Sequence, residues 1–270
     1  MDTRKTPYRL RCLPAMSTAQ KFFIALALCA LTLFVLSAQT LFPLSAQQAF
    51  DAGERHFDAR NQSQYDINAA EHFFRIAAEK DPTLPYLYHE LARIDFLRGN
   101  FTAALSKINF QISLHGDSEP NSYYVRGLIE GYMGRYDDSI VDYKHYLQFD
   151  PHDWAAINDY CWVLLKANRP AEALAESSQG LVQFPGNAWL ANTNTIALYE
   201  VGDLQAAELE AREALIATAA VTPTQWLIAY PGNDPGVAGE GVAALQQAAR
   251  DNMHTILTAL ASSTVQSTHD

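Results

Sequence analysis

The feature that most constrains this chain is a small residue that returns at an almost constant interval. The residues concerned are Ala70, Ala104, Ser139, Ala173 and Ala207, which lie 34, 35, 34 and 34 positions apart. A fixed period of this length indicates repeated supersecondary units, each of which buries its apolar face only against its neighbours. We therefore expect a stack of units rather than a single closed core.

Turn signals precede these small residues. Glycine or asparagine lies a few positions earlier in four of the copies, at Gly99, Gly134, Asn168 and Gly202. Both residue types readily adopt the left-handed backbone conformation that ends a helix. The residue just after the turn is aromatic or bulky in each copy: Ile67, Phe101, Tyr136, Pro170 and Leu204. The pattern predicts two short amphipathic helices and a tight turn in each unit.

Residues 120–151 show the repeat most clearly. Six positions carry the pattern: Tyr123, Gly127, Gly134, Tyr136, Tyr143 and Pro151. On these residues the segment resembles the tetratricopeptide repeat, although Arg126 and Glu130 stand where a leucine and a tyrosine are usual. The resemblance covers about 170 of the 270 residues and is weakest in the first copy, residues 51–82, where Glu54 and Asn61 stand in place of large residues.

The resemblance implies an all-α fold, a right-handed α-solenoid of five helix-turn-helix repeats over residues 49–219. Five copies exceed the roughly three that such an array needs for stability. Residues 1–48 are expected to form a cytoplasmic N-terminus and a transmembrane helix or signal segment. Residues 220–270 are expected to form a helical cap and a disordered tail.

An uncharged apolar segment lies near the N-terminus. Phe22–Leu44 has 23 residues, about what a tilted helix needs to cross a bilayer. All the nearby basic residues precede it: Arg4, Lys5, Arg9, Arg11 and Lys21. The positive-inside rule predicts a single-pass membrane protein with residues 1–21 in the cytoplasm and a periplasmic or extracellular body. The alternative is a cleaved signal peptide, with Val35-Leu36-Ser37 as its cleavage site, which places the body on the same side.

The repeat register is lost after Ala219. Thr222-Pro223 is typical of a helix start, and Pro231-Gly232 would end this short helix. A longer helix is expected after Asp234-Pro235, with an apolar stripe at Val242, Leu245, Ala249, Met253, Ile256 and Leu260. The stripe would either cap the exposed end of the solenoid or serve as a docking surface, for a partner or for self-association. The tail from Ser263 is expected to be disordered.

The charge distribution argues against nucleic acid as a partner. The net charge is −11, with +4 in residues 1–38 and therefore −15 in the remainder. Phosphate binding needs clustered lysine and arginine, which this acidic body lacks.

No catalytic or metal-binding pattern is present in the sequence. None of the eight histidines falls in a metal-ligand pair, and no serine lies in a nucleophile-elbow context. Cys161 occupies the small-residue position of the first helix of the fourth repeat, which favours a buried structural thiol over a nucleophile. We therefore expect a protein that is not an enzyme, with no cofactor and no metal.

The resemblance also implies where a ligand would bind. In the family, ligands lie along the inner face made by the first helix of each repeat. Carrying that register over gives Tyr86, His89, Arg93 and Phe96 in the second repeat, Tyr124, Leu128 and Tyr132 in the third, Asn158, Trp162 and Lys166 in the fourth, and Trp189, Asn192, Ile196 and Tyr199 in the fifth. Aromatic side chains are typical anchors of binding surfaces, and asparagine can bind a peptide backbone.

Two functions fit these observations. The leading hypothesis is a membrane-anchored extracytoplasmic scaffold that binds a protein or peptide in this groove, in envelope assembly or secretion. The alternative is a module that binds envelope glycan by stacking sugar rings on Tyr124, Tyr132, Trp162 and Trp189. Only Arg93 and Lys166 supply positive charge along the predicted groove, which disfavours a clamp for a C-terminal carboxylate.

Overall fold

The computed structural model describes residues 43–267. The chain divides into two units, Met1–Leu44 and Ser45–Asp270, and the contacts given below lie within the second. The predicted membrane segment lies outside the described residues apart from Pro43 and Leu44. Within the part of the chain that is described, no helix combines the length and the apolar character needed to cross a membrane.

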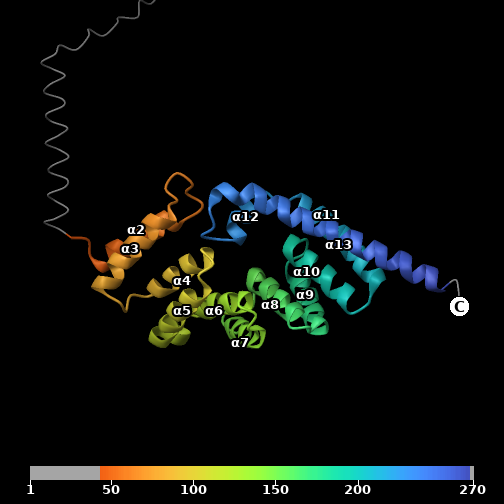
Figure 1. Ribbon diagram of the computed structural model, residues 1–270, viewed down its shortest axis with the longest axis horizontal. Helices are drawn as coiled ribbons and strands as arrows, with labels where there is room; N and C mark the ends of the chain where they lie inside the picture. The colour runs from red at the N-terminus through yellow and green to blue at the C-terminus, as the bar shows by residue number, and fades with distance from the viewer. Residues whose placement is uncertain (1–42, 268–270) are drawn as a thin grey trace, which may run out of the picture. The chain divides into compact units, whose positions relative to one another are not determined.

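Residues 46–219 form ten helices that pair in sequence order (Figure 1). The pairs, which we number units one to five, are α2 Ala46–Phe57 with α3 Ile67–Lys80, α4 Leu87–Leu97 with α5 Phe101–His115, α6 Asn121–Tyr132 with α7 Tyr136–Tyr146, α8 Trp154–Lys166 with α9 Pro170–Gln183, and α10 Ala188–Glu200 with α11 Leu204–Ala219. A 3-10 turn, η1 Gly116–Ser118, follows α5. Each helix packs chiefly on its own pair partner and on the next unit, so the fold is an all-α solenoid of helix pairs.

The recurring small residues lie where the two helices of a unit approach most closely. All five, from Ala70 to Ala207, have 0% exposed surface. In unit three the Ser139 hydroxyl donates to the Gly127 carbonyl oxygen at 2.6 Å, and a Cβ at Gly127 would stand 3.3 Å from the Tyr143 ring. Larger side chains would force the helices apart, which explains why this position repeats. Cys161 is also fully buried, and burial raises the pKa of its thiol.

The turns follow the predicted backbone conformation. Gly99, Gly134, Asn168 and Gly202 have φ values of 75°, 76°, 58° and 87°. The bulky residues that follow these turns are the first residues of the second helices, as is Ile67 in unit one. Unit one departs from the pattern, because a longer connection joins Phe57 to Ile67 and ends in Asp66, whose carboxylate caps α3. The first helix, α2, also begins at Ala46, ahead of the expected boundary at residue 49.

The segment after unit five contains the two predicted helices. α12 Pro223–Ala229 begins with a capping box at Thr222, and η2 Pro235–Val237 leads into α13 Ala238–Ser267. The apolar stripe of α13 is buried or half-buried along its whole length, and α13 packs on α11 and α10. It therefore caps unit five. α13 continues through Ser267, so the helix includes residues 263–267 of the expected tail.

The part of this segment that precedes α13 does more than cap the last unit. Residues 223–234, which we term the strap, lie over the inner face formed by the first helices of the units. Three hydrogen bonds fix it: Tyr65 Oη donates to Gly232 O at 2.7 Å, Arg93 Nη2 to Pro231 O at 2.7 Å, and Trp189 Nε1 to Tyr230 Oη at 3.0 Å. These bonds reach units one, two and five.

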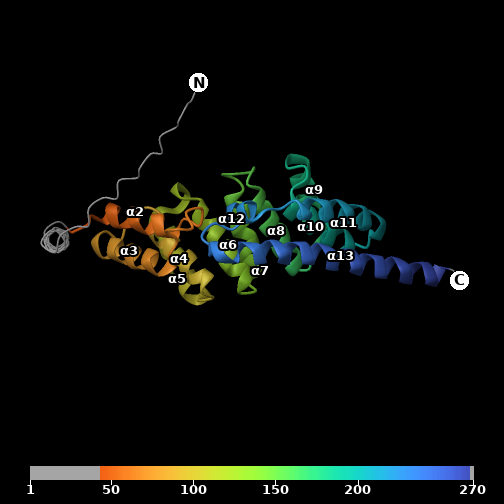
Figure 2. The same ribbon diagram turned by 90° about the horizontal axis from the view of Figure 1, so that it is seen from above.

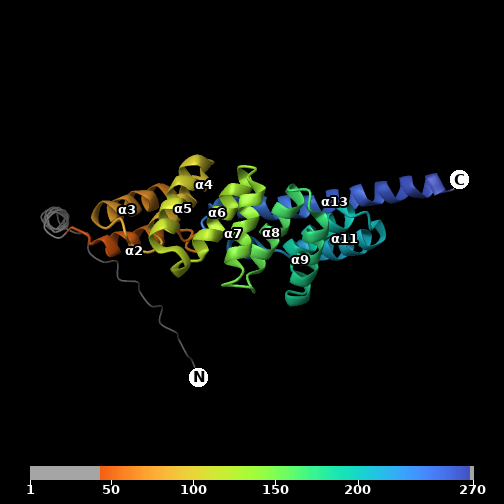
Figure 3. The same ribbon diagram turned by 90° about the horizontal axis from the view of Figure 1, so that it is seen from below.

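The figures show the same arrangement. α12 and α13 lie in front of α6 and α8 in Figure 2, and α13 lies behind α7 and α9 in Figure 3. The C-terminal segment therefore covers one face of the solenoid, the face on which the sequence places the binding groove.

Candidate binding site on the inner face

A cavity of about 550 Å³ lies between the inner face and the C-terminal segment. Helices α4, α6, α8 and α10 form one wall, and the strap with the start of α13 forms the other. Seven of the predicted groove residues line this strap cavity: Arg93, Phe96, Tyr124, Leu128, Tyr132, Asn158 and Trp162. Among the strap and cap residues that line it are Trp226, Tyr230, Asn233, Ala244 and Leu245.

One wall of the strap cavity is a row of aromatic rings in contact, with Phe96 edge-to-face on Tyr132 and Tyr132 stacked on Trp162. The Phe96 and Tyr132 centroids are 5.1 Å apart, and the Tyr132 and Trp162 centroids are 5.6 Å apart at an interplanar angle of 30°. Tyr132 is nevertheless 56% exposed. Lys166 lies next to this row, with Nζ 5.7 Å from the Trp162 centroid, and is itself exposed. The wall therefore offers aromatic surface to a ligand without having to rearrange.

The polar part of the cavity surrounds Asp159. Tyr124 Oη donates to its Oδ2 at 2.8 Å, and Asn158 Nδ2 donates to its Oδ1 at 3.3 Å. Asn158 in turn accepts a hydrogen bond of 2.8 Å from Thr193 Oγ1. Burial raises the pKa of Asp159 to about 6, chiefly through loss of hydration, although its two hydrogen bonds act in the opposite direction.

Two residues predicted for the groove have structural roles instead. His89 is only 6% exposed, and its Nδ1 lies 3.4 Å from Ser122 Oγ. Burial lowers the pKa of His89 to about 3, so the ring is neutral at physiological pH. Tyr86 is the left-handed N-cap of α4, and its backbone N–H donates to Glu119 Oε2 at 3.1 Å. Both residues join units two and three rather than facing the strap cavity.

The predicted residues of unit five are largely covered by the chain itself. Trp189 donates to Tyr230 of the strap, and Asn192 Oδ1 accepts from Asn252 Nδ2 of α13 at 2.9 Å. Ile196 and Tyr199 line a smaller cavity of about 160 Å³ against α13. The repeat register places these side chains on the inner face but does not reveal that α13 covers that face.

The rings proposed for glycan stacking differ in whether neighbouring aromatic rings of the protein cover them. Tyr124 packs against Tyr143 and Tyr146 at centroid distances of 5.7 and 5.5 Å, and Trp189 packs against Trp154 at 5.0 Å. Other aromatic side chains of the protein therefore already pack against the rings of both residues. Tyr132 and Trp162 remain at the cavity wall.

Sequence reasoning missed Asp159, Trp226 and Tyr230. The two aromatic residues fall in the segment without repeat register, so no alignment of copies could place them on the inner face. Asp159 could have been found, because it shares the first helix of unit four with Asn158 and Trp162.

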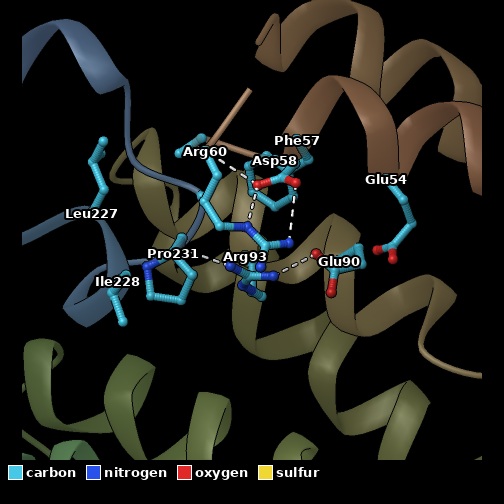
Figure 4. Close-up of a pocket in the computed structure, with 11 residues that line it drawn as sticks. Glu54, Phe57, Asp58, Arg60, Glu90, Arg93, Leu227, Ile228 and Pro231 are labelled. Carbon is cyan, nitrogen blue, oxygen red and sulfur yellow. Dashed lines mark hydrogen bonds and ion pairs between the residues drawn. The ribbon is translucent and has the colours of Figure 1, made fainter. Parts of the chain in front are cut away.

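A second cavity of about 330 Å³ lies where the strap meets units one and two (Figure 4). Arg93 Nη1 donates to Glu90 Oε2 at 2.7 Å, and its guanidinium carbon lies 4.9 Å from the Phe57 ring centroid. Arg60 pairs with Asp58 at 2.8 Å, and Glu54 points toward the same space. Most charge in this second cavity is therefore compensated internally.

Comparisons with known proteins identify the fold. Searches against family models and curated proteins found no match. Among solved structures, the chain is similar to MamA (14% identity, TM-score 0.54, covering 64% of this chain and 92% of that one). It is also similar to YrrB, described as a TPR protein with an unusual peptide-binding site (14% identity, TM-score 0.55, covering 68% of this chain and 92% of that one). A third similar structure is PilF of Pseudomonas aeruginosa (15% identity, TM-score 0.56, covering 78% of this chain and 90% of that one). The chain therefore has the tetratricopeptide-repeat fold, as the sequence predicts.

Proposed function

We propose that this protein is an interaction scaffold that holds a segment of a protein partner in the strap cavity. The carrying observation is the cavity itself, which combines an exposed aromatic wall with convergent polar groups at Asn158 and Asp159. Aromatic anchors and a few placed polar groups are what specific binding sites use. The fold is that of scaffold proteins, and YrrB, which shares it, is described as having a peptide-binding site.

The volume of the cavity limits the size of the partner segment that it can hold. Its volume of about 550 Å³ falls within the range of about 300–1,000 Å³ that is usual for ligand sites. The strap crosses the inner face, so a long extended peptide would not have the whole groove available. The site accommodates one or two anchor side chains and the backbone that carries them.

The same scaffold is proposed to act on the extracytoplasmic side of a membrane, in envelope assembly or secretion. The apolar segment Phe22–Leu44 and the basic residues before it support this proposal. Alkaline extraction of membranes tests the anchor. Release of the full-length body into the supernatant would count against a retained helix, and N-terminal sequencing would identify a cleaved signal.

Position-specific photocrosslinking in cells tests the binding site. A photoreactive phenylalanine at Tyr132, on the cavity wall, is expected to form adducts with a partner. The same group at Val141 of α7, which is 66% exposed and does not line the cavity, is the matched control. Filling the cavity with Ala244→Trp should remove the Tyr132 adducts while leaving the helical content unchanged. Adducts that persist in the filled variant would overturn the proposed site.

A further inference from the structure

Two carboxylates occupy the same place in two different units. Glu90 lies 14 positions before Ala104, and Asp159 lies 14 positions before Ala173. In unit two the residue three positions after the carboxylate is Arg93, which neutralises Glu90. In unit four the corresponding residue is Trp162. The repeat therefore provides a cation for one inner-face carboxylate and an aromatic ring beside the other.

Asp159 has no cation of its own. Within residues 43–267, no lysine, arginine or histidine lies within 4.0 Å of its carboxylate oxygens, and its hydrogen-bond donors are the neutral Tyr124 and Asn158. Asp159 is half-buried, and a carboxylate withdrawn from water without a cation is costly, because hydrogen bonds from neutral groups replace only part of its hydration. A bound cation would remove that cost.

The nearby basic side chains are already engaged or point elsewhere. Arg93 lines the strap cavity, but its guanidinium is held by Glu90 and by the Pro231 carbonyl oxygen, each at 2.7 Å. Lys166 lies over the Trp162 ring and does not line the cavity. Neither residue supplies the missing positive charge.

The walls of the cavity suit a cation. A guanidinium or ammonium group is attracted to the face of an aromatic ring, most strongly to tryptophan. Unit two already shows this chemistry, because Arg93 is held between the Glu90 carboxylate and the Phe57 ring. The strap cavity repeats the combination with Asp159 as the carboxylate and Tyr132, Trp162 and Tyr230 among its walls.

We propose that the strap cavity binds an arginine or lysine side chain of the partner, with Asp159 as its counter-ion and the aromatic rings as its walls. This inference rests on the proposed function and specifies the chemistry of the anchor side chain. The guanidinium or ammonium group takes in unit four the place that Arg93 occupies in unit two.

Two short peptides that differ in one atom of one side chain test the proposal. The probes are the N-acetylated, C-amidated tripeptides Gly-Arg-Gly and Gly-citrulline-Gly, titrated calorimetrically into the full-length protein in mild detergent at pH 8. Citrulline keeps the shape of arginine and lacks its charge. The arginine peptide should bind at least about tenfold more tightly, as expected for a desolvated charge pair. Equal affinity for the two peptides, or no binding of the arginine peptide, would overturn the proposal.

Asp159→Asn is the diagnostic variant, and the exposed Asp137→Asn on α7 is its matched control. The preference for arginine should vanish in the first variant and remain in the second. The wild-type comparison stands on its own even if Asp159→Asn folds poorly. If the protein shows no preference for the charged peptide, the proposed arginine or lysine anchor is wrong. The proposed scaffold function is then unaffected, because the photocrosslinking experiment tests it separately.

Discussion

Units two and four are built on the same helix-pair plan and use their inner faces in opposite ways. In unit two the carboxylate Glu90 is neutralised by Arg93, and the same arginine binds the strap at Pro231. In unit four Asp159 has only neutral hydrogen-bond donors and faces a cavity. The same helix position therefore holds a carboxylate in a structural ion pair in one unit and a carboxylate that lines a cavity in another.

The largest expected effect is the loss of the ion pair in unit two. Arg93→Ala should lower the free energy of unfolding by about 3 kcal/mol or more, because it leaves the buried Glu90 without its partner and removes a strap contact. Chemical denaturation measures the change. The double variant Arg93→Met with Glu90→Gln should recover much of the loss, and its failure to do so would show that strap contact, rather than charge, dominates.

The matching change in unit four should affect binding instead. Trp162→Ala is expected to weaken partner binding by at least about 2 kcal/mol, roughly thirtyfold, because the ring forms part of the cavity wall. Trp189→Ala is the comparison variant: Trp189 does not line the strap cavity but donates to Tyr230 of the strap, so a smaller loss is expected. A larger loss of binding affinity from Trp189→Ala than from Trp162→Ala would indicate that the partner binds at unit five.

Acidification should change stability through Asp159 and His89 with opposite signs. The folded-state pKa of Asp159 is raised from its usual 3.8 to about 6, so the folded protein takes up this proton more readily than the unfolded chain. This group therefore adds stability as pH falls from about 6 to about 4. The pKa of His89 is lowered from 6.5 to about 3, so this group removes stability as pH falls from about 6.5 toward 3.

Variants isolate these two contributions. Stability measured against pH should show a smaller acid-side gain in Asp159→Asn and a smaller acid-side loss in His89→Gln, each compared with the wild type. The same protonation should weaken binding of the arginine peptide below about pH 6. The ionisable groups that interact electrostatically with Asp159 include Tyr124, Tyr132, Tyr143, Asp153, Cys161 and Tyr230. The tyrosines and the thiol stay neutral over this range because their pKa values are raised.

The smallest effect is expected from Tyr132→Phe. Binding should change by less than about twofold, because the contacts of Tyr132 with Phe96 and Trp162 are ring contacts that phenylalanine preserves. Fluorescence titration with the same peptides measures it. A loss above about tenfold would indicate that the hydroxyl, rather than the ring, contacts the ligand.

Much of the fold could be predicted because its signals are local. The left-handed turns at Gly99, Gly134, Asn168 and Gly202 depend on the conformational preference of one residue each. The stripe of α13 from Val242 to Leu260 depends on helical periodicity. Unit one was harder to place, since its long connection to Ile67 carries no left-handed residue.

The candidate site could be predicted only in part. The register placed Tyr132, Asn158 and Trp162 on the inner face, and all three line the strap cavity. It also selected His89, which is buried in the seam between units two and three. A register fixes the direction of a side chain from its helix, but the packing of the next unit decides whether that side chain reaches solvent.

The sequence by itself determined the period, the helix pairs and the fully buried small residues, because each follows from side-chain size and backbone preference within a few turns of helix. Only the tertiary structure decided that residues 223–234 lie across the inner face, where Tyr65, Arg93 and Trp189 hold them. Contacts between residues that far apart in the chain leave no periodic trace in the sequence. Within residues 43–267, the groove that the repeat predicts is thereby divided, and its cavity of about 550 Å³ contains the carboxylate of Asp159, whose hydrogen-bond donors are neutral.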